Sequence, residues 1–532
     1  MFDLLIKNTK IIDGTGQPAF YGSVASRSGL LTILPADTKV PATEVIDGTG
    51  KTTCPGFIDA HSHGDITIGQ KFASLAKISQ GVTSQVTGMC GLSLFPVDPN
   101  KLKALQESLS PQTEKFPDEM GTFTNCESFL HFSNALPQSI NTFFLVGHSS
   151  LRIAAMGFED RKPTAIEMQK MKGMLREAME AGAMGLSSGL IYIPSTYADS
   201  SELIELCKIV DEYGGIYTTH LRSESTKCLE SVAEAIEVAQ KSGVRLHISH
   251  HKIAGQKNWG NSKHTLKMID QANDAGISVS CDQYPYTFCM THLCNCMPPK
   301  YFTEGFSAAA DFLKDPITRE HIRNEMSDPE NDYDNFYLNS GGWEGVYLVK
   351  SPKLAEAEKM TISEYANNIG IDPFDAFCKI MIANNGLASA IYFSMCDDDL
   401  FKIIQNCHTV VGTDGILRSM DDYTHPRSYG SFPHAIRTFV KENKIFSMEE
   451  MIQKMTSSTA NIYKIKNKGI IMNNYDSDIV VFDEDKLLDL ANFEHPLRLS
   501  TGIDYVVVNG KVAYCNKNMT IEKPGKIIRF NR

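Results

Sequence analysis

The 532-residue sequence lacks any long uninterrupted run of apolar side chains, and no basic segment precedes an apolar core near its N-terminus. These absences argue against a membrane span and against a secretory signal. An excess of basic residues is missing as well: 51 lysines and arginines face 63 aspartates and glutamates, a formal charge of −12. The sequence therefore predicts neither nucleic acid nor a membrane surface as a partner.

A disulfide framework is also absent from the pattern of cysteines. The thirteen cysteines are odd in number and scattered, and several stand among apolar neighbours, as in residues 206–209. Such cysteines are typical of reduced thiols, so we expect a cytoplasmic protein. The apolar share of 42% and the charged share of 21% are those of a folded globular chain, long enough for a large barrel or for two to three domains.

The two ends of the chain resemble each other and differ from its middle. Residues 3–50 and 470–532 alternate short β-type runs with Gly, Asp and Pro turns, including the hairpin signal Asn509-Gly510. We expect residues 1–53 and 467–532 to form one small β-sandwich domain, which brackets a central domain over residues 54–466.

The central domain alternates strand-like and helix-like segments, the pattern of a parallel βα architecture. Helical periodicity is clear over residues 165–181 and 225–241. Eight candidate strands end near His63, Cys90, His148, Ser187, His220, His250, Asp282 and Asp414. This α/β pattern predicts a (β/α)8 TIM barrel. The last interval is longer than one crossover needs, so we expect an inserted lid at about residues 295–350.

Residues that could bind a metal stand at these strand ends. In an extended strand His61 and His63 project from the same face, side by side. The other candidates are Cys90, His220, His250 and Asp414. A thiolate with imidazoles is a zinc-type ligand set, and a carboxylate beside the metal is a ready general base.

Each of these residues has a plain alternative role. The histidine pair could lie on a surface loop, Cys90 could be a small core residue, His250 a core histidine with satisfied hydrogen bonds, and Asp414 a helix N-cap. The presence of all six candidate residues at the ends of strands favours a metal site over these separate explanations.

Several motifs, in order along nearly the whole chain, resemble the N-acyl-D-amino-acid deacylases, the D-aminoacylase branch of the amidohydrolase superfamily. They are residues 55–63 (PGFIDAHSH), 88–91 (GMCG), 145–148 (LVGH), 189–192 (GLIY), 220–224 (HLRSE), 248–252 (ISHHK), 282–286 (DQYPY), 412–415 (GTDG), 425–427 (HPR) and 478–483 (DIVVFD). The His-x-His alone is typical of the whole superfamily, whereas the cysteine motif with Ser-His-His-Lys indicates this branch.

The resemblance implies a division of labour at the site. Cys90, His220 and His250 would hold one tightly bound zinc. His61 and His63, with Cys90 shared and Asp414 nearby, would form a second, weaker site; Asp414 would be the catalytic acid/base.

A substrate carboxylate needs a cation or hydrogen-bond donors when it leaves water. Lys252 and Tyr284 follow barrel strands and are candidates for this role. The resemblance adds Lys402, in a place where the family often has arginine. It also implies that Tyr192, Tyr392 and Met395 line an apolar side-chain pocket.

The sequence departs from the family at Met89, where asparagine is usual, and at Ser225, where glycine is common. The expected activity is zinc-dependent hydrolysis of the amide bond of small N-acyl-D-amino acids; the D preference follows from the resemblance alone. A cyclic-amide or dipeptide hydrolase and a non-catalytic scaffold are the alternatives. The substrate side chain and the oligomeric state are left open.

Overall fold

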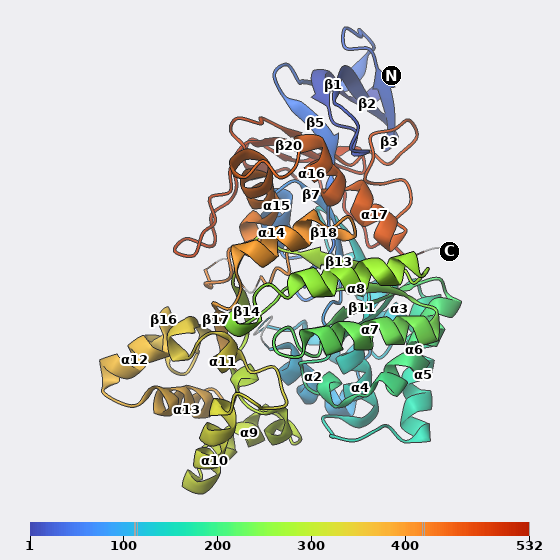
Figure 1. Ribbon diagram of the computed structural model, residues 1–532. Helices are drawn as coiled ribbons and strands as arrows, with labels where there is room; N and C mark the ends of the chain where they lie inside the picture. The colour runs from blue at the N-terminus through green and yellow to red at the C-terminus, as the bar shows by residue number, and fades with distance from the viewer. Residues whose placement is uncertain (111–112, 114, 418, 420, 531–532) are drawn as a thin grey trace.

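The computed structural model describes residues 1–110, 113, 115–417, 419 and 421–530. Figure 1 shows a central barrel with a β-rich layer formed by both chain ends on one side and a helical extension on the other. Among the described residues, no helix combines the length and the apolar character needed to cross a membrane.

Parallel strands form the expected barrel. They are β6 (Phe57–Asp59), β7 (Val82–Thr87), β8 (Asn141–Phe144) continued by β9 (Val146–Gly147), β10 (Gly185–Gly189), β11 (Ile216–His220), β12 (Arg245–Ile248), β13 (Val279–Gln283) and β18 (Thr409–Val411). The order β6-β7-β8 and the order β9-β10-β11-β12-β13-β18 are continuous in hydrogen bonding. The N–H of Asp414 donates to the carbonyl of His61 at 2.9 Å, which closes the ring between its last and first strands.

Helices cover the outside of this barrel. They are α1 (Lys71–Ile78), α2 (Leu102–Leu109), α3 (Cys126–Ala135), α4 (His148–Met156), α5 (Ala165–Glu180), α6 (Ser200–Glu212), α7 (Cys228–Ser242), α8 (Ser262–Asp274), α14 (Asp397–Gln405), α15 (Arg427–Ala435), α16 (Met448–Met455) and α17 (Ser457–Tyr463). In α5 a capping box joins Thr164 and Glu167, and Met171, Leu175 and Ala178 are buried at helical spacing. Sequence periodicity located this helix to within one residue.

The insertion between β13 and α14 is longer than residues 295–350. Its antiparallel sheet contains β14 (Cys289–His292), β15 (Val346–Lys350), β16 (Met360–Thr361) and β17 (Ser389–Tyr392), in the order β14-β17-β15-β16. Its helices are α9 (Phe306–Phe312), α10 (Pro316–Ser327), α11 (Phe336–Asn339), α12 (Ile362–Ile369) and α13 (Pro373–Ala383). Because β14 and β17 are direct neighbours, the insertion is one folded unit from residue 289 to residue 392.

Strands from both ends of the chain share one sheet. They are β1 (Phe2–Ile11), β2 (Phe20–Arg27), β3 (Leu30–Leu34), β4 (Ala42–Asp47), β5 (Thr52–Pro55), β19 (Ile479–Phe482), β20 (Ile503–Val508), β21 (Lys511–Cys515) and β22 (Asn518–Met519). β19 pairs with β5, which joins the two ends. At the turn between β20 and β21, Asn509 and Gly510 both have positive φ, as a tight hairpin requires.

Candidate metal centre

All six expected metal-site residues meet at the carboxyl ends of the barrel strands. His61 and His63 follow β6, Cys90 follows β7, His220 ends β11, His250 follows β12 and Asp414 follows β18. None is more than 7% exposed. The barrel thus converts strand ends that lie far apart in sequence into one closed cluster.

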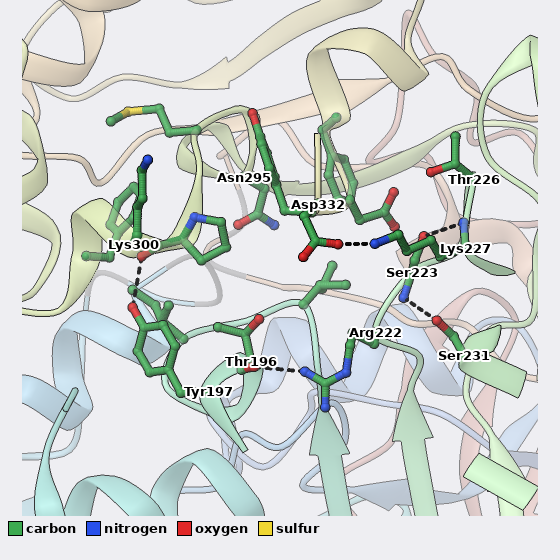
Figure 2. Close-up of a pocket in the computed structure, with 18 of the residues that line it drawn as sticks. Thr196, Tyr197, Arg222, Ser223, Thr226, Lys227, Ser231, Asn295, Lys300 and Asp332 are labelled. Atoms are coloured by element: carbon green, nitrogen blue, oxygen red, sulfur yellow. Dashed lines mark hydrogen bonds and ion pairs between the residues drawn. The ribbon is translucent and has the colours of Figure 1, made fainter. Parts of the chain in front are cut away.

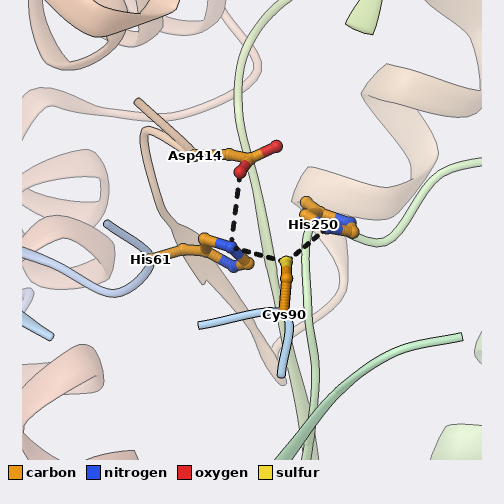
Figure 3. A group of neighbouring side chains, drawn as sticks. All are labelled: His61, Cys90, His250 and Asp414. Atoms are coloured by element: carbon orange, nitrogen blue, oxygen red, sulfur yellow. Dashed lines mark hydrogen bonds and ion pairs between the residues drawn. The ribbon is translucent and has the colours of Figure 1, made fainter. Parts of the chain in front are cut away.

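One group surrounds the thiol of Cys90 from the side of the first and last strands (Figure 3). Cys90 Sγ lies 3.3 Å from His61 Nε2, which lies 3.4 Å from Asp414 Oδ1. His63 Nε2 is 3.1 Å from the same Asp414 oxygen. Donor atoms around a tetrahedral zinc stand about 3.5 Å apart, so these spacings fit a metal ion.

A second group contacts the same thiol from the opposite side. Cys90 Sγ lies 3.3 Å from His250 Nε2 and 4.0 Å from His220 Nδ1. Cys90 is therefore placed to serve both groups. Glu224, which the sequence analysis did not single out as a site residue, joins His220 and His250 in a cluster whose donor atoms lie within 4.8 Å of one another.

The backbone at the site is unusual. Cys90, His250 and Asp414 have φ values of 56°, 35° and 46°, in the left-handed region that L residues seldom adopt. Gly88, with φ +75°, has no room for a side chain, because a Cβ would lie 2.4 Å from the carbonyl oxygen of Leu145. Such backbone strain is typical of functional sites, where surrounding structure imposes it.

The charge state of Asp414 is set by its neighbours. Burial raises the pKa of this carboxyl, but the guanidinium charge of Arg427, together with His61 and a hydrogen bond from His63, outweighs burial and holds the pKa well below its usual range. Nη1 of Arg427 lies 2.9 Å from Asp414 Oδ2, and the guanidinium is buried. Asp414 is therefore an ionised carboxylate at neutral pH, able to accept a proton.

Burial acts on the other ligands as well. It raises the pKa of the Cys90 thiol, and it lowers the pKa of His220 and of His250 well below the usual value. Both imidazoles are consequently neutral at neutral pH, the form that binds metals, whereas the thiol must lose a proton on coordination.

The carboxylate of Asp282, outside the metal cluster, orients His61. Asp282 Oδ2, at the end of β13, accepts hydrogen bonds at 3.2 Å from His61 Nδ1 and at 2.9 Å from His247 Nε2. This contact directs the other nitrogen of His61 toward Cys90. A carboxylate behind a metal-binding histidine fixes its tautomer and its ring orientation.

A buried ion pair joins the first and last strands beneath the site. Lys77 Nζ contacts Asp59 Oδ2 at 2.5 Å and Thr413 Oγ1 at 2.6 Å. Asp59 also accepts from the N–H groups of Thr413 at 2.8 Å and of His61 at 3.2 Å. This network fixes the backbone at Asp59 and Thr413, which stand just before His61 and Asp414 in the sequence.

Tyr284 and Lys252 lie at the site, as expected. The Arg427 guanidinium stacks over the Tyr284 ring at 4.6 Å, and the Lys252 ammonium lies 5.8 Å from the same ring. Lys252 Nζ is 2.6 Å from Glu224 Oε1 and 2.7 Å from His250 Nδ1. Among the described residues, the Tyr284 hydroxyl and the Arg427 Nε–H are buried without a hydrogen-bond partner.

The structure does not bring Lys402 to the site. Lys402 stands on the exposed face of α14, whereas Leu400 and Ile403 face inward. The buried cation is Arg427, thirteen residues after Asp414. The signal that could have identified it was the His-Pro-Arg motif at 425–427, which carries part of the family resemblance.

The three expected pocket residues have different surroundings. The Tyr192 ring packs against His220, with centroids 5.0 Å apart, and its hydroxyl is 3.1 Å from Thr291 Oγ1. Tyr392 is fully buried and donates to the carbonyl of His292 at 2.6 Å, and Met395 is half-buried against the main core. Of the three, Tyr192 contacts a metal-site residue.

A cavity of about 560 Å³ lies between loops of the barrel mouth and the insertion (Figure 2). Its walls come from the loops after β10 and β11 and from the insertion, including residues 191, 193, 222–223, 294–295 and 332–334. The ion pair between Lys227 and Asp332 crosses from a barrel loop to the insertion. The insertion therefore closes this side of the barrel mouth.

Comparison with known proteins identifies the family. A model of the amidohydrolase family matches residues 398–514. The sequence is 32% identical over 528 residues to N-acyl-D-aspartate deacylase of Alcaligenes xylosoxydans xylosoxydans, covering 99% of this chain and 95% of the relative. The chain belongs to the N-acyl-D-amino-acid deacylase family of amidohydrolases. D-aminoacylase of the same organism is 31% identical over 531 residues, or 99% of this chain and 97% of that one.

Solved structures of this deacylase family share the fold. N-acyl-D-glutamate deacylase from Bordetella bronchiseptica, complexed with zinc and a phosphonate that mimics the tetrahedral intermediate, matches with a TM-score of 0.83 and 30% identity over 99% of both chains. A D-aminoacylase with a binuclear metal centre, activated by one metal and attenuated by a second, gives the same score and identity over 99% of both chains. The family and the fold expected from the motifs are confirmed.

The donor set of this chain fits zinc. A thiol, imidazole nitrogens and a carboxylate converge within 4.8 Å, and they come from the ends of barrel strands. These are the ligand types that zinc takes in proteins.

Proposed function

We propose that this chain hydrolyses the amide bond of N-acyl-D-amino acids and releases a carboxylate and a free D-amino acid. The observation that carries the proposal is the juxtaposition of the Cys90 centre with the unpartnered, buried donors of Arg427 and Tyr284. A buried donor without an acceptor is costly, so this corner suits a ligand with acceptor oxygens. An N-acyl amino acid brings a carboxylate to it.

Cys90, His220 and His250 would hold the tightly bound zinc, and His61 and His63 with Cys90 would form a weaker second site. When bound, zinc activates a water molecule and polarises the carbonyl of the substrate.

Asp414 would act as the general acid/base. Its carboxylate takes the proton of the attacking water and later delivers a proton to the departing amine, which must leave as a neutral or protonated species. The low pKa that Arg427 and the histidines impose keeps Asp414 ionised for the first transfer. The buried Arg427 would serve two partners. Its Nη1 faces Asp414, and its Nε–H has no hydrogen-bond acceptor in the described part of the protein and can donate to a substrate oxygen.

The neighbourhood of Tyr192 favours apolar substrate side chains. Beside Tyr192, the side chains of Leu92, Ile193 and Phe306 border a space of about 20 Å³, together with the polar side chains of Ser108, His292 and Asn295. The relatives named N-acyl-D-aspartate deacylase, N-acyl-D-glutamate deacylase and D-aminoacylase are all 31–32% identical to this chain. Sequence identity alone therefore does not show which of their substrates this chain prefers. We infer a preference for apolar D-residues such as methionine or leucine.

The alternatives have less support. An unsubstituted hydantoin or dihydropyrimidine has no carboxylate to satisfy Arg427 and Tyr284, and the hydantoinase and dihydropyrimidinase structures that match at 14–16% identity share the fold only. A non-catalytic scaffold would not need all six ligands and an ionised Asp414 in one place.

The free cysteines support a cytoplasmic location. Each of the thirteen cysteines is unpaired, and only Cys407 is exposed. Thiols that remain reduced suit a reducing compartment.

The test is amine release by zinc-loaded protein from matched D and L N-acetyl derivatives of methionine, leucine, phenylalanine, glutamate and aspartate. We expect hydrolysis of the D members alone, fastest for the apolar ones. If the protein hydrolysed no member of this panel but did hydrolyse a cyclic amide, the proposed substrate class would be wrong. A preference for D-aspartate or D-glutamate would overturn the inferred side-chain pocket while leaving the reaction intact.

A further inference from the structure

Glu224 lies behind the metal centre, four residues after His220, and is only 3% exposed. Its two oxygens face two different metal-site histidines. Oε2 lies 3.4 Å from His220 Nε2, and Oε1 lies 3.2 Å from His250 Nδ1. One carboxylate therefore spans the outer nitrogens of both rings.

The inner nitrogens of these rings face the thiol. His220 presents Nδ1 to Cys90 and His250 presents Nε2. A neutral imidazole that gives one lone pair to a metal carries its proton on the other nitrogen. Metal binding at Cys90 would thus leave an N–H at His220 Nε2 and at His250 Nδ1, the two atoms that Glu224 faces.

Lys252 competes for one of these atoms. Its ammonium lies 2.7 Å from His250 Nδ1, a hydrogen bond that requires this nitrogen to be without a proton. With the proton on Nδ1, two donors would face each other, and the acceptor within reach is Glu224 Oε1. The Lys252 contact and a metal-binding tautomer of His250 therefore exclude each other.

The insertion holds Glu224 in place. Asp334, which precedes α11, accepts a hydrogen bond at 2.8 Å from the backbone N–H of Glu224 and another from the hydroxyl of Ser225. Asn339 in turn donates to Asp334 at 2.7 Å. Asp334 therefore binds the loop at two consecutive residues, once through the backbone and once through a side chain.

We propose that Glu224 is a positioning residue for the tight zinc site: it accepts hydrogen bonds from His220 and His250 at once, and Asp334 of the insertion fixes the loop that carries it. The proposal depends on the zinc site of the proposed function. If Glu224 has this role, the insertion affects metal affinity through Asp334. Lys252 would then no longer bond to His250 when the metal is bound.

The test compares zinc affinity of the full-length wild-type chain and of Glu224→Gln, by competition with a chelator. Loss of an orienting partner costs about 10- to 100-fold in metal affinity, so we expect a weakening in that range for Glu224→Gln. The thiolate-to-metal absorption of the cobalt-substituted protein should remain, since Cys90 still binds. Glu224→Asp, which keeps a carboxylate, should recover part of the affinity.

Glu230→Gln is the matched control, because Glu230 is exposed six residues further along and contacts neither histidine. Its zinc affinity should equal that of the wild type. Asp334→Ala leaves Glu224 itself intact and should weaken zinc binding by a smaller factor than Glu224→Gln; an unchanged affinity would overturn the link to the insertion.

Three results would overturn the role of Glu224. One is an affinity of Glu224→Gln equal to that of the control. Another is a zinc content of Glu224→Gln that falls by one per chain even at saturating zinc, which would make Glu224 a ligand. The third is a wild type that binds no zinc. A wild type that binds zinc but cleaves no N-acyl-D-amino acid would instead refute the proposed function, and the affinity comparison would stand.

Discussion

Nη1 of Arg427 lies 2.9 Å from Oδ2 of Asp414, and both side chains are buried at the mouth of the barrel. The pair would connect two tasks of the proposed reaction, because the cation that faces the proposed general base also borders the Tyr284 ring, and both side chains carry buried donors without a partner among the described residues. We therefore expect the arginine to affect both substrate binding and the protonation of Asp414.

Replacing this arginine should change kinetics in two ways. Arg427→Met removes a charge-assisted contact worth about 1.5–3 kcal/mol, so KM should rise roughly 10- to 100-fold. It also removes a positive charge that lowers the pKa of Asp414. Because Asp414 acts in its ionised form, a higher pKa shifts the acidic limb of the kcat/KM profile to higher pH. Steady-state kinetics across pH measures both effects.

Lys402→Met is the control for this variant. The lysine was expected at the substrate carboxylate, but it lies on the exposed face of α14. Its kinetics should match those of the wild type. An unchanged profile for Arg427→Met, or a raised KM for Lys402→Met, would contradict the placement of the carboxylate at Arg427.

Cys90 should determine metal content. In Cys90→Ala the thiolate that both histidine groups contact is missing, so zinc per chain and turnover should fall together. Elemental analysis of the purified protein and amine release measure the two quantities. Cys207→Ala removes a buried thiol from α6 and should keep both. A Cys90→Ala protein with full zinc content and turnover would refute the assignment.

Asp414 should affect chemistry more than metal content. Because the proposed tight site consists of Cys90, His220 and His250, Asp414→Ala should retain one zinc. Loss of a general acid/base lowers turnover by about 10²- to 10⁴-fold. Zinc analysis and single-turnover assays separate the two effects. Near-normal turnover in this variant would exclude Asp414 as the base.

The convergence of the candidate metal residues was predictable from the sequence for a physical reason. Buried parallel strands are short apolar runs, and in a barrel their carboxyl ends meet, so polar residues that end such runs converge. His61, Cys90 and Asp414 are separated by up to 353 positions, yet the strand pattern alone brings them together. Their arrangement in the structure follows that expectation.

Other features depend on contacts that sequence patterns do not encode. The insertion was expected at 295–350, but pairing of β14 with β17 extends it to residue 392. Helices α12 and α13 have the same periodicity as barrel helices, so periodicity could not assign them to the insertion. Arg427 stands in no strand, and only the fold shows that its charge turns inward whereas that of Lys402 faces solvent.

The buried pair of Lys77 and Asp59 should contribute to stability. Lys77→Met leaves Asp59 buried with its charge uncompensated, and breaking such a pair costs about 3–5 kcal/mol. Denaturant unfolding of the full-length chain measures this loss. The double variant Lys77→Met/Asp59→Asn should lose less than the sum of the single variants, because neither charge is then left alone. Strict additivity would show that the pair is not coupled.

Zinc affinity should rise with pH. Burial raises the pKa of the Cys90 thiol, so near neutral pH the thiol is protonated before zinc binds and must release that proton. His220 and His250 have lowered pKa values and are already neutral. One proton released per zinc predicts an affinity that increases about tenfold per pH unit below the thiol pKa.

Calorimetric titration with zinc in buffers of different ionisation enthalpy measures this proton release directly. We expect close to one proton released per tightly bound zinc between about pH 6.5 and 8, because this range lies below the usual thiol pKa of about 8.5. Cys90→Ala is the matched variant, and its residual zinc binding should lose the pH dependence that the thiol contributes. An affinity of the wild type that stays constant over this range would mean that Cys90 is already a thiolate without metal, which burial among these neighbours opposes.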